Sequence, residues 1–161
     1  MKLLIKEKMF SLFDSFKVYN EEGDTVYKVN GKLALKHSFE VENAKGEVVA
    51  SLKEKLISLL PEYRVTIHGK DMGAVEKKLT LIHPKFTFTG KGWTASGDIF
   101  EWDYEIKDKN HKKVATISKK LLHLTDTYMI DTVRDEDALA CLMFVLAIDA
   151  DKCTREQIAE N

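Results

Sequence analysis

Four acidic residues fall close together in the sequence, and a pair of such carboxylates could perform general acid and base catalysis, as in glycoside cleavage. These residues are Asp98, Glu101, Asp103 and Glu105. The last three alternate with large apolar residues, which are Phe100, Trp102, Tyr104 and Ile106. Such alternation is typical of a β-strand with one face in the core and the other in solvent. We therefore interpret the acids as a solvated outer face, and Asp98, which follows Gly97, as a turn residue.

Other side chains that could perform chemistry are scattered along the chain. The histidines show none of the spacings that hold a metal ion; they are His37, His68, His83, His111 and His123. Cys141 lies within an apolar run, where burial raises the pKa of a thiol and makes it unreactive. The sequence also lacks a phosphate-binding loop, a dinucleotide fingerprint and a nucleophile elbow. We predict no catalytic residue, no metal and no cofactor, and keep an enzyme of unknown chemistry as an alternative.

A basic stretch is the best candidate for a binding site. Residues 109–125 contain five lysines, two histidines and no acid, although the whole chain has a formal net charge of −1. From residue 126 onward nine acids face three basic residues, a net charge of −6. The basic stretch is either a solvated strand-and-turn surface or a face for anionic phospholipid head groups or an acidic protein partner. The residues of this predicted face are Lys109, Lys112, Lys113, Lys119 and Lys120.

A second group of basic residues is interleaved with aromatic residues, as in proteins that bind single-stranded nucleic acid. The lysines are Lys77, Lys78, Lys85 and Lys91, and the aromatics are Phe86, Phe88 and Trp93. These aromatics alternate as core residues do, and the net charge gives no bulk attraction to a polyanion. We do not expect nucleic acid to bind.

The element that must organise these surfaces is an apolar run near the end of the sequence. Residues 138–148 are eleven consecutive apolar residues, and Asp135, Glu136 and Asp137 precede them. Acids at this position favour a helix start, and a helix that is apolar all round is buried. We predict a central helix over about 135–149 and a polar tail over 150–161, in which Thr154 could cap a short terminal helix. The apolar run is about half of the ~20 residues that a membrane span needs, so we predict no transmembrane segment.

Most of the chain before this helix consists of related strand pairs. Residues 39–59 align without gaps onto residues 104–124, at an offset of 65. A shorter copy at 16–26 lies 23 residues before the first. Each copy holds an aromatic residue, alternating apolar residues, an Asn or Asp and a second alternating run, which predicts a β-hairpin. A strand is expected to follow each long copy, over 62–68 and 127–133.

Counting the alternating segments, which include 74–82, 85–89 and 93–106, gives ten to twelve strands. A sheet of that size splits or curls, and an apolar helix as its filling favours closure. We predict a mainly β protein with one domain over 1–161, a closed barrel of about twelve strands around a central helix, duplicated internally. Two cysteines are too few for a disulfide framework, and the first residues do not form a signal peptide, so we expect a cytoplasmic protein.

Several stretches, in this order, resemble the LURP-one-related family. They are residues 5–23 (IKEKMFSLFDSFKVYNEEG), 26–29 (VYKV), 52–63 (LKEKLISLLPEY), 97–106 (GDIFEWDYEI) and the closing apolar run. The resemblance covers nearly the whole chain. It implies the fold of the tubby C-terminal domain and, more distantly, of phospholipid scramblases, which is a twelve-stranded barrel around a hydrophobic C-terminal helix.

The same resemblance bears on function. Tubby proteins bind phosphoinositides through a basic pocket, but no distinctive match to that pocket occurs here, so no binding residue is transferred. We expect a non-enzymatic binding or scaffold domain, with the five-lysine face as its candidate surface and a location in the cytoplasm or at the membrane periphery. The alternative is a membrane-acting protein of the scramblase type that inserts residues 138–148.

Overall fold

The computed structural model describes residues 1–6, 15–32, 36–122 and 125–159. Within these residues the chain forms twelve strands, one short 3-10 helix and one α-helix. The strands are β1 (Lys2–Ile5), β2 (Ser15–Tyr19), β3 (Thr25–Gly31), β4 (Ser38–Asn43), β5 (Val48–Glu54), β6 (Glu62–Ile67), β7 (Lys70–Lys78), β8 (Lys85–Phe88), β9 (Trp93–Asp98), β10 (Asp103–Lys107), β11 (Lys113–Leu122) and β12 (Thr125–Thr132). Residues 7–14, part of the first family-like stretch, lie outside this description.

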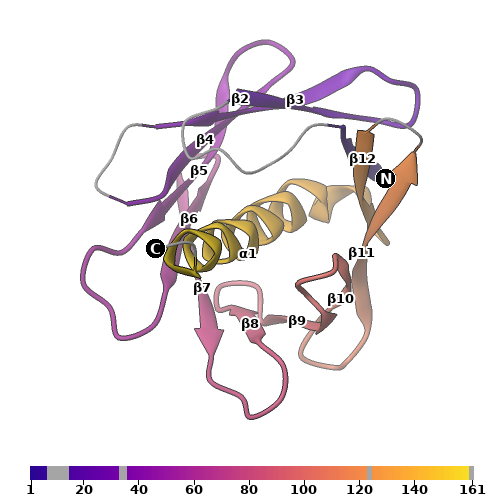
Figure 1. The fold of residues 1–161 in the computed structure, drawn as a ribbon. Helices are drawn as coiled ribbons and strands as arrows, with labels where there is room; N and C mark the ends of the chain where they lie inside the picture. Colours follow the sequence, from indigo (N-terminus) through magenta and orange to yellow (C-terminus); the bar gives the residue numbers. More distant parts are fainter. Residues whose placement is uncertain (7–14, 33–35, 123–124, 160–161) are drawn as a thin grey trace.

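The strands form a closed barrel in which neighbours in the sequence are neighbours in space (Figure 1). Every pairing among the described strands is antiparallel. Closure comes from β1, which pairs with β2 and also with β12, where Leu3 lies opposite Ile130. A closed barrel has no unpaired edge strand. The predicted mainly β, closed and twelve-stranded fold is confirmed.

The three copies of the sequence repeat build three hairpins with the same turn. Asn20, Asn43 and Asp108 each accept backbone hydrogen bonds through the side-chain Oδ1, at 2.8–3.0 Å. In each turn the residue three positions later donates its N–H to the carbonyl of that Asn or Asp. This later residue has a positive φ: 90° at Gly23, 79° at Gly46 and 61° at His111. Short side-chain bonds of this kind direct the chain back on itself.

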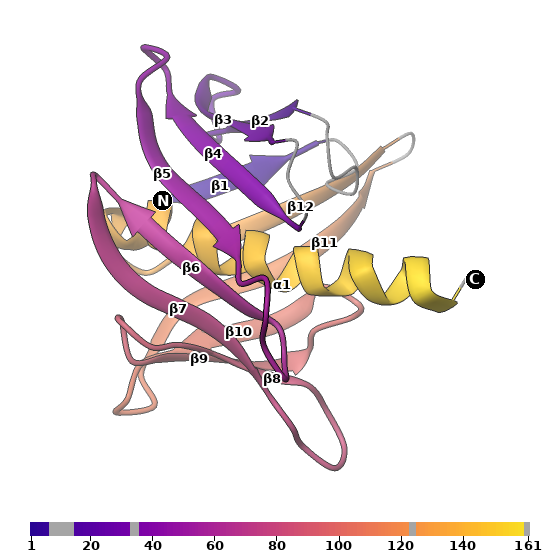
Figure 2. The ribbon, with the colours of Figure 1, turned by 90° about the vertical axis from the view of Figure 1, so that its left-hand side faces the viewer.

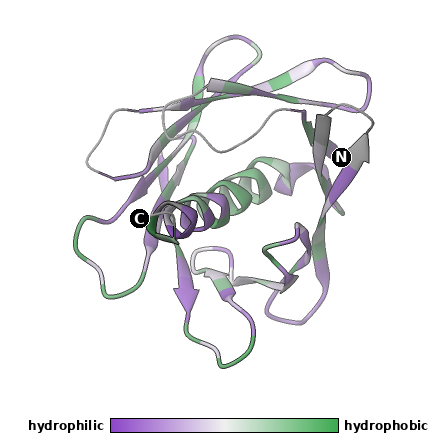
Figure 3. Ribbon diagram, in the orientation of Figure 1, coloured by the Kyte–Doolittle hydropathy of each residue, from purple (hydrophilic) through white to green (hydrophobic). Residues whose placement is uncertain are grey.

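The helix α1 (Ala138–Ala159) runs through the inside of the barrel, after the 3-10 helix η1 (Asp135–Asp137) (Figure 2). Leu142, Met143, Phe144 and Val145 have no exposed surface. Figure 3 shows the apolar part of α1 enclosed by strands, which confirms the predicted central helix. The predicted end at residue 149 is wrong, because one continuous helix extends to Ala159. The residues expected in a polar tail include Asp151 and Cys153, which are buried.

Two predicted strands are shorter than expected. The segment predicted over 74–82 leaves the sheet at Lys78, where it pairs with Lys85, so residues 79–82 form a loop. The alternation from Phe100 to Ile106 becomes a strand only at Asp103, because residues 99–102 form the β9–β10 turn and Trp102 has a φ of 60°. Trp102, Tyr104 and Ile106 are buried as predicted.

Candidate binding site

The five predicted lysines lie in two groups at the two ends of one strand. Lys109 and Lys112 lie in the β10–β11 turn, and Lys113 begins β11. Lys119 and Lys120 come near the other end of that strand. A strand rises about 3.3 Å per residue, so the groups are about 20 Å apart. Binding by the five-lysine face stays a prediction, and one small anion could not contact all five side chains.

Two of these lysines already have partners. Lys113 Nζ lies 2.5 Å from Glu105 Oε1, and Lys107 binds the other oxygen of the same carboxylate at 3.0 Å. The side-chain hydrogen bond to Lys113 and then that to Lys107 lower the pKa of Glu105. Lys119 Nζ lies 5.8 Å from the centre of the Tyr128 ring, at one end of the barrel.

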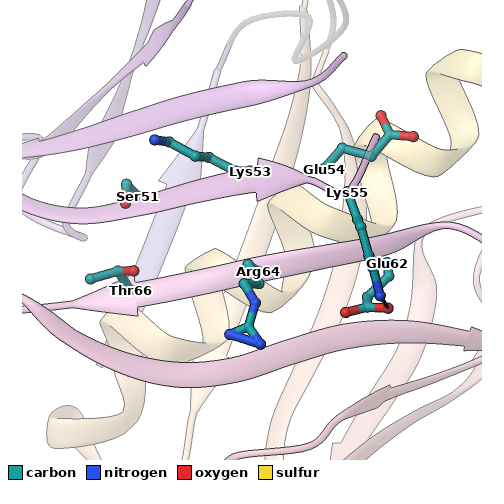
Figure 4. A pocket seen from close by; sticks show the side chains of 7 residues that line it. All are labelled: Ser51, Lys53, Glu54, Lys55, Glu62, Arg64 and Thr66. Carbon is teal, nitrogen blue, oxygen red and sulfur yellow. Dashed lines mark hydrogen bonds and ion pairs between the residues drawn. The ribbon is translucent and has the colours of Figure 1, made fainter. Parts of the chain in front are cut away.

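A separate basic site lies on the outside of the barrel, between β5 and β6. We call it the outer groove; it has a volume of about 330 Å³ and is lined by Ser51, Lys53, Glu54, Lys55, Glu62, Arg64 and Thr66 (Figure 4). Successive residues of a strand point to opposite faces. The sequence places Leu52 and Val65 in the core, fully buried, and turns their neighbours Lys53 and Arg64 to the outer surface.

The register of the two strands decides the chemistry of the outer groove. Lys53 lies directly opposite Arg64, and Ser51 lies opposite Thr66. Two like charges at opposite positions of an antiparallel pair destabilise the sheet. Ser51 and Thr66 add two hydroxyl groups that can donate hydrogen bonds. Two cations and two hydroxyls on one face form a donor set that suits a phosphate or another oxyanion.

The acids around the outer groove leave part of this donor set unused. Arg64 Nη1 donates to Asp71 at 2.6 Å, and the other N–H groups of the guanidinium are not used in this ion pair. Glu62 accepts from Lys55 at 3.1 Å, as Figure 4 shows. Glu54 turns away from the outer groove to His37, 2.6 Å from Nδ1, and to Lys36 at 3.1 Å. Lys53 makes no ion pair with any described residue.

A second set of polar groups is buried around the last turns of α1. Asp151 binds Lys77 of β7 at 2.8 Å. Asp149 Oδ1 and the hydroxyls of Tyr63 and Tyr104 are buried with no hydrogen-bond partner among the described residues. Burial, followed by the charge of nearby Asp149, raises the pKa of Tyr104 well above its usual value. These groups are closed off from solvent, so we treat them as structural parts of the interior.

The structure brings no catalytic set together among the described residues. Glu101 and Asp103 are exposed at the outer surface, as predicted. Burial, the largest influence, raises the pKa of Cys141 to about 12, so its thiol stays protonated. No group of three or more His, Cys, Asp or Glu side chains among the described residues could hold a metal ion. No helix in the described part of the chain is long and apolar enough to cross a membrane.

The sequence pattern did not identify the outer groove. Lys53 and Arg64 occur as single charges in alternating runs, eleven residues apart, and each looks like an ordinary outward residue. Only the register of β5 against β6 places them opposite each other. The repeat predicted strands in this region, but it did not indicate which outward residues of β5 and β6 lie opposite each other.

Comparisons with known proteins agree on the family and the fold. The family model described as LURP-one-related matches residues 1–149. The uncharacterized protein YxjI of Bacillus subtilis (strain 168) is 33% identical over 150 residues, which cover 92% of each chain. The X-ray structure of a protein from Arabidopsis thaliana has a TM-score of 0.59 at 16% identity, and the match covers 90% of this chain and 88% of that one. At that identity the structural likeness concerns the fold alone.

Proposed function

The chain belongs to the LURP-one-related family, and from that premise we propose that it is a non-enzymatic binding domain that holds a phosphate-type anion in the outer groove. The observation that carries this proposal is the direct opposition of Lys53 and Arg64. The repulsion between these two side chains is relieved when an anion lies between them, because each cation then gains an opposite charge.

Two further observations support binding over catalysis. The seven residues that line the outer groove include no histidine and no cysteine, so neither hydroxyl has an imidazole beside it for activation. The groove is open to solvent, whereas catalytic sites strengthen their electrostatic interactions by excluding water. Cys141 is a buried free thiol, which is consistent with the cytoplasmic location that we propose.

The test is a titration of the protein with inorganic phosphate and with a soluble inositol phosphate at low salt, followed by amide NMR shifts. We expect shifts at Ser51, Lys53, Arg64 and Thr66. Lys53→Glu should weaken binding by about tenfold or more, because it replaces a cation in the groove with an anion. Lys112→Glu is the matched control, since Lys112 is an exposed lysine in the distant β10–β11 turn.

Two results would contradict the outer groove as the anion site. One is equal affinity of the wild type and Lys53→Glu. The other is a set of shifts that maps to Lys109–Lys120, which would assign binding to the five-lysine face. Shifts confined to the groove and removed by Lys53→Glu alone would support the proposal.

A further inference from the structure

Two loops expose aliphatic side chains at one end of the barrel. The loop between β5 and β6 carries Leu56, Ile57 and Leu59, and the loop between β7 and β8 carries Leu79, Leu81 and Ile82. We call these six residues the apolar rim. Leu59 and Leu81 are each 104% exposed, so their side chains are fully open to solvent. Single exposed apolar residues are common, but a group of large ones marks an interaction surface.

The two loops of the apolar rim are neighbours. β6 pairs with β7, and the first loop returns to the sheet at Pro61, whose carbonyl accepts from the Lys77 N–H at 3.4 Å. Lys78 and Lys85 form the last pair before the second loop. Figure 1 shows both loops projecting outward from the barrel, and Figure 3 shows hydrophobic residues in each of them. This is also the end at which Lys77 binds the last turns of α1.

Cations stand at the base of each loop. Lys78 and Lys85 lie opposite each other below the second loop, and Lys85 makes no ion pair with a described residue. Lys55 stands at the base of the first loop, paired with Glu62. Apolar tips with cations one layer behind match the layers of an anionic bilayer, in which acyl chains lie below the head groups. A protein groove would bury one continuous face, whereas these side chains project from two separate tips.

We propose that the apolar rim inserts into the surface of an anionic lipid bilayer, with Lys78 and Lys85 at the level of the phosphates. The tips enter the acyl boundary while the barrel and its helix stay folded, so α1 does not leave the interior. This inference goes beyond the proposed function and does not require an anion in the outer groove. The two surfaces are nevertheless adjacent, because β5 leads from the groove directly into the first loop.

The test is flotation of the full chain with vesicles of phosphatidylcholine alone or mixed with phosphatidylserine. We expect binding to the mixed vesicles, and binding at least about tenfold weaker after Leu59→Ser with Leu81→Ser, because each substitution removes a large side chain from the apolar phase. Val48→Ser with Val133→Ser is the matched control. Val48 is 55% and Val133 is 64% exposed, and both lie at the opposite end of the barrel.

A second measurement locates the contact. Leu81→Trp and, as its control, Val133→Trp place an indole at each end, and brominated lipids quench an indole that enters the bilayer. We expect lipid-dependent quenching above the background of the buried Trp93 and Trp102 only for Leu81→Trp. The four substituted residues, Leu59, Leu81, Val48 and Val133, are all exposed, so thermal melting should be unchanged in every variant.

Several outcomes would overturn the inference. Vesicle binding that survives Leu59→Ser with Leu81→Ser would assign the membrane contact to another segment. Absence of wild-type binding to the mixed vesicles would show that the apolar rim does not insert into an anionic bilayer. Self-association that is lost in the same double variant, without vesicle binding, would identify a second copy of the chain as the occupant. Failure of the phosphate titration would leave this inference untouched, since flotation reports on the loops.

Discussion

Lys77 of β7 and Asp151 of α1 form an ion pair of 2.8 Å whose side chains are only 11% and 3% exposed. It joins the barrel wall to the helix that fills the barrel, 74 residues later in the sequence. Arg155, one turn further along α1, lies 3.5 Å from the same carboxylate oxygen. The helix is therefore held by a charged contact as well as by its apolar surface.

We predict that Lys77→Met destabilises the protein by about 3 kcal/mol, because it leaves a buried carboxylate with Arg155 alone. The free energy of unfolding from urea denaturation measures this change. Lys77→Met combined with Asp151→Leu should recover much of the loss, since both charges are then absent. The control is Lys78→Met, which breaks the more exposed pair with Glu76 and should change stability little. Equal effects of Lys77→Met and Lys78→Met would contradict this prediction.

Asp149 should make the protein less stable as the pH rises. Burial, the largest influence, raises the pKa of Asp149 well above its usual value; nearby Lys152 opposes this and Glu156 adds to it. An acid with a raised pKa in the folded state keeps its proton when the unfolded chain has lost it. The folded state is therefore favoured below the unfolded pKa of about 4, and this advantage is lost as the pH rises toward the folded pKa.

Asp149→Asn should consequently stabilise the protein at neutral pH by about 1 kcal/mol or more, and should flatten the fall in melting temperature between pH 5 and pH 8. Asp98→Asn, at the exposed end of β9, is the control and should change neither quantity. A less stable Asp149→Asn variant at pH 7 would mean that the carboxylate is ionised and held by hydrogen bonds.

Glu54, in contrast to Asp149, should make the protein more stable as the pH rises from acidic values. Burial is the largest single influence and would raise its pKa, but the hydrogen bonds from His37 and Lys36 together outweigh burial and lower it. This contribution to stability is present above the unfolded pKa and is lost as the pH falls through the folded pKa. Glu54→Gln should therefore be less stable than the wild type at pH 6, with a smaller difference near pH 3 in chemical denaturation. A difference that grows toward pH 3 would refute the assignment.

The repeated turns predict opposite effects of substitutions at equivalent positions. His111 has a φ of 61° where the related turns have Gly23 and Gly46. A side chain in the left-handed region is strained, so His111→Gly should stabilise the protein by about 0.5–1 kcal/mol. Gly46→Val should destabilise it by about 1–2 kcal/mol through the backbone alone, since an added Cβ at Gly46 would meet no atom within 4 Å. Thermal melts of both variants check the signs, and a destabilising His111→Gly would mean that its imidazole makes a compensating contact.

Deletion of residues 135–161 should unfold the protein. The deletion removes the fully buried Leu142, Met143 and Phe144 and leaves the apolar inner faces of the strands without a partner. We expect an insoluble fragment with no cooperative melting transition. A soluble 1–134 fragment that melts cooperatively would show that the barrel holds without its helix.

Local chemistry explains which parts of the fold could be predicted from the sequence. Asn43 and Asp108 form their turns with residues two to four positions away, so the repeat indicates the hairpins directly. The apolar run likewise identifies the helix, because only a buried helix tolerates it on every face. The end of the helix was misplaced because Asp149 and Asp151 look like solvent-facing residues. Asp151 is buried through a partner in β7, which no local pattern reveals.

Both proposed surfaces, the outer groove and the apolar rim, are set by how neighbouring strands pair, which the sequence pattern does not reveal. Leu79 and Leu81 continue the alternation of β7 and were predicted to be strand, but the pairing of Lys78 with Lys85 ends the sheet before them. Thr80 then donates to the His83 carbonyl and forms the loop. The opposition of Lys53 and Arg64 is also set by register. Alternation indicates which face a residue occupies, and it does not indicate which residue lies beside it.

The closure of the barrel by β1 and β12 has a consequence for protein synthesis. Every other strand pair joins neighbours in the chain and can form soon after its residues leave the ribosome. β1 must wait for β12, and α1, which fills the interior, is made later still. Until then a growing chain presents two open edges and an uncovered apolar face to the surrounding cell. The last stretch of translation is thus the interval in which a nascent chain of this architecture most needs protection by chaperones.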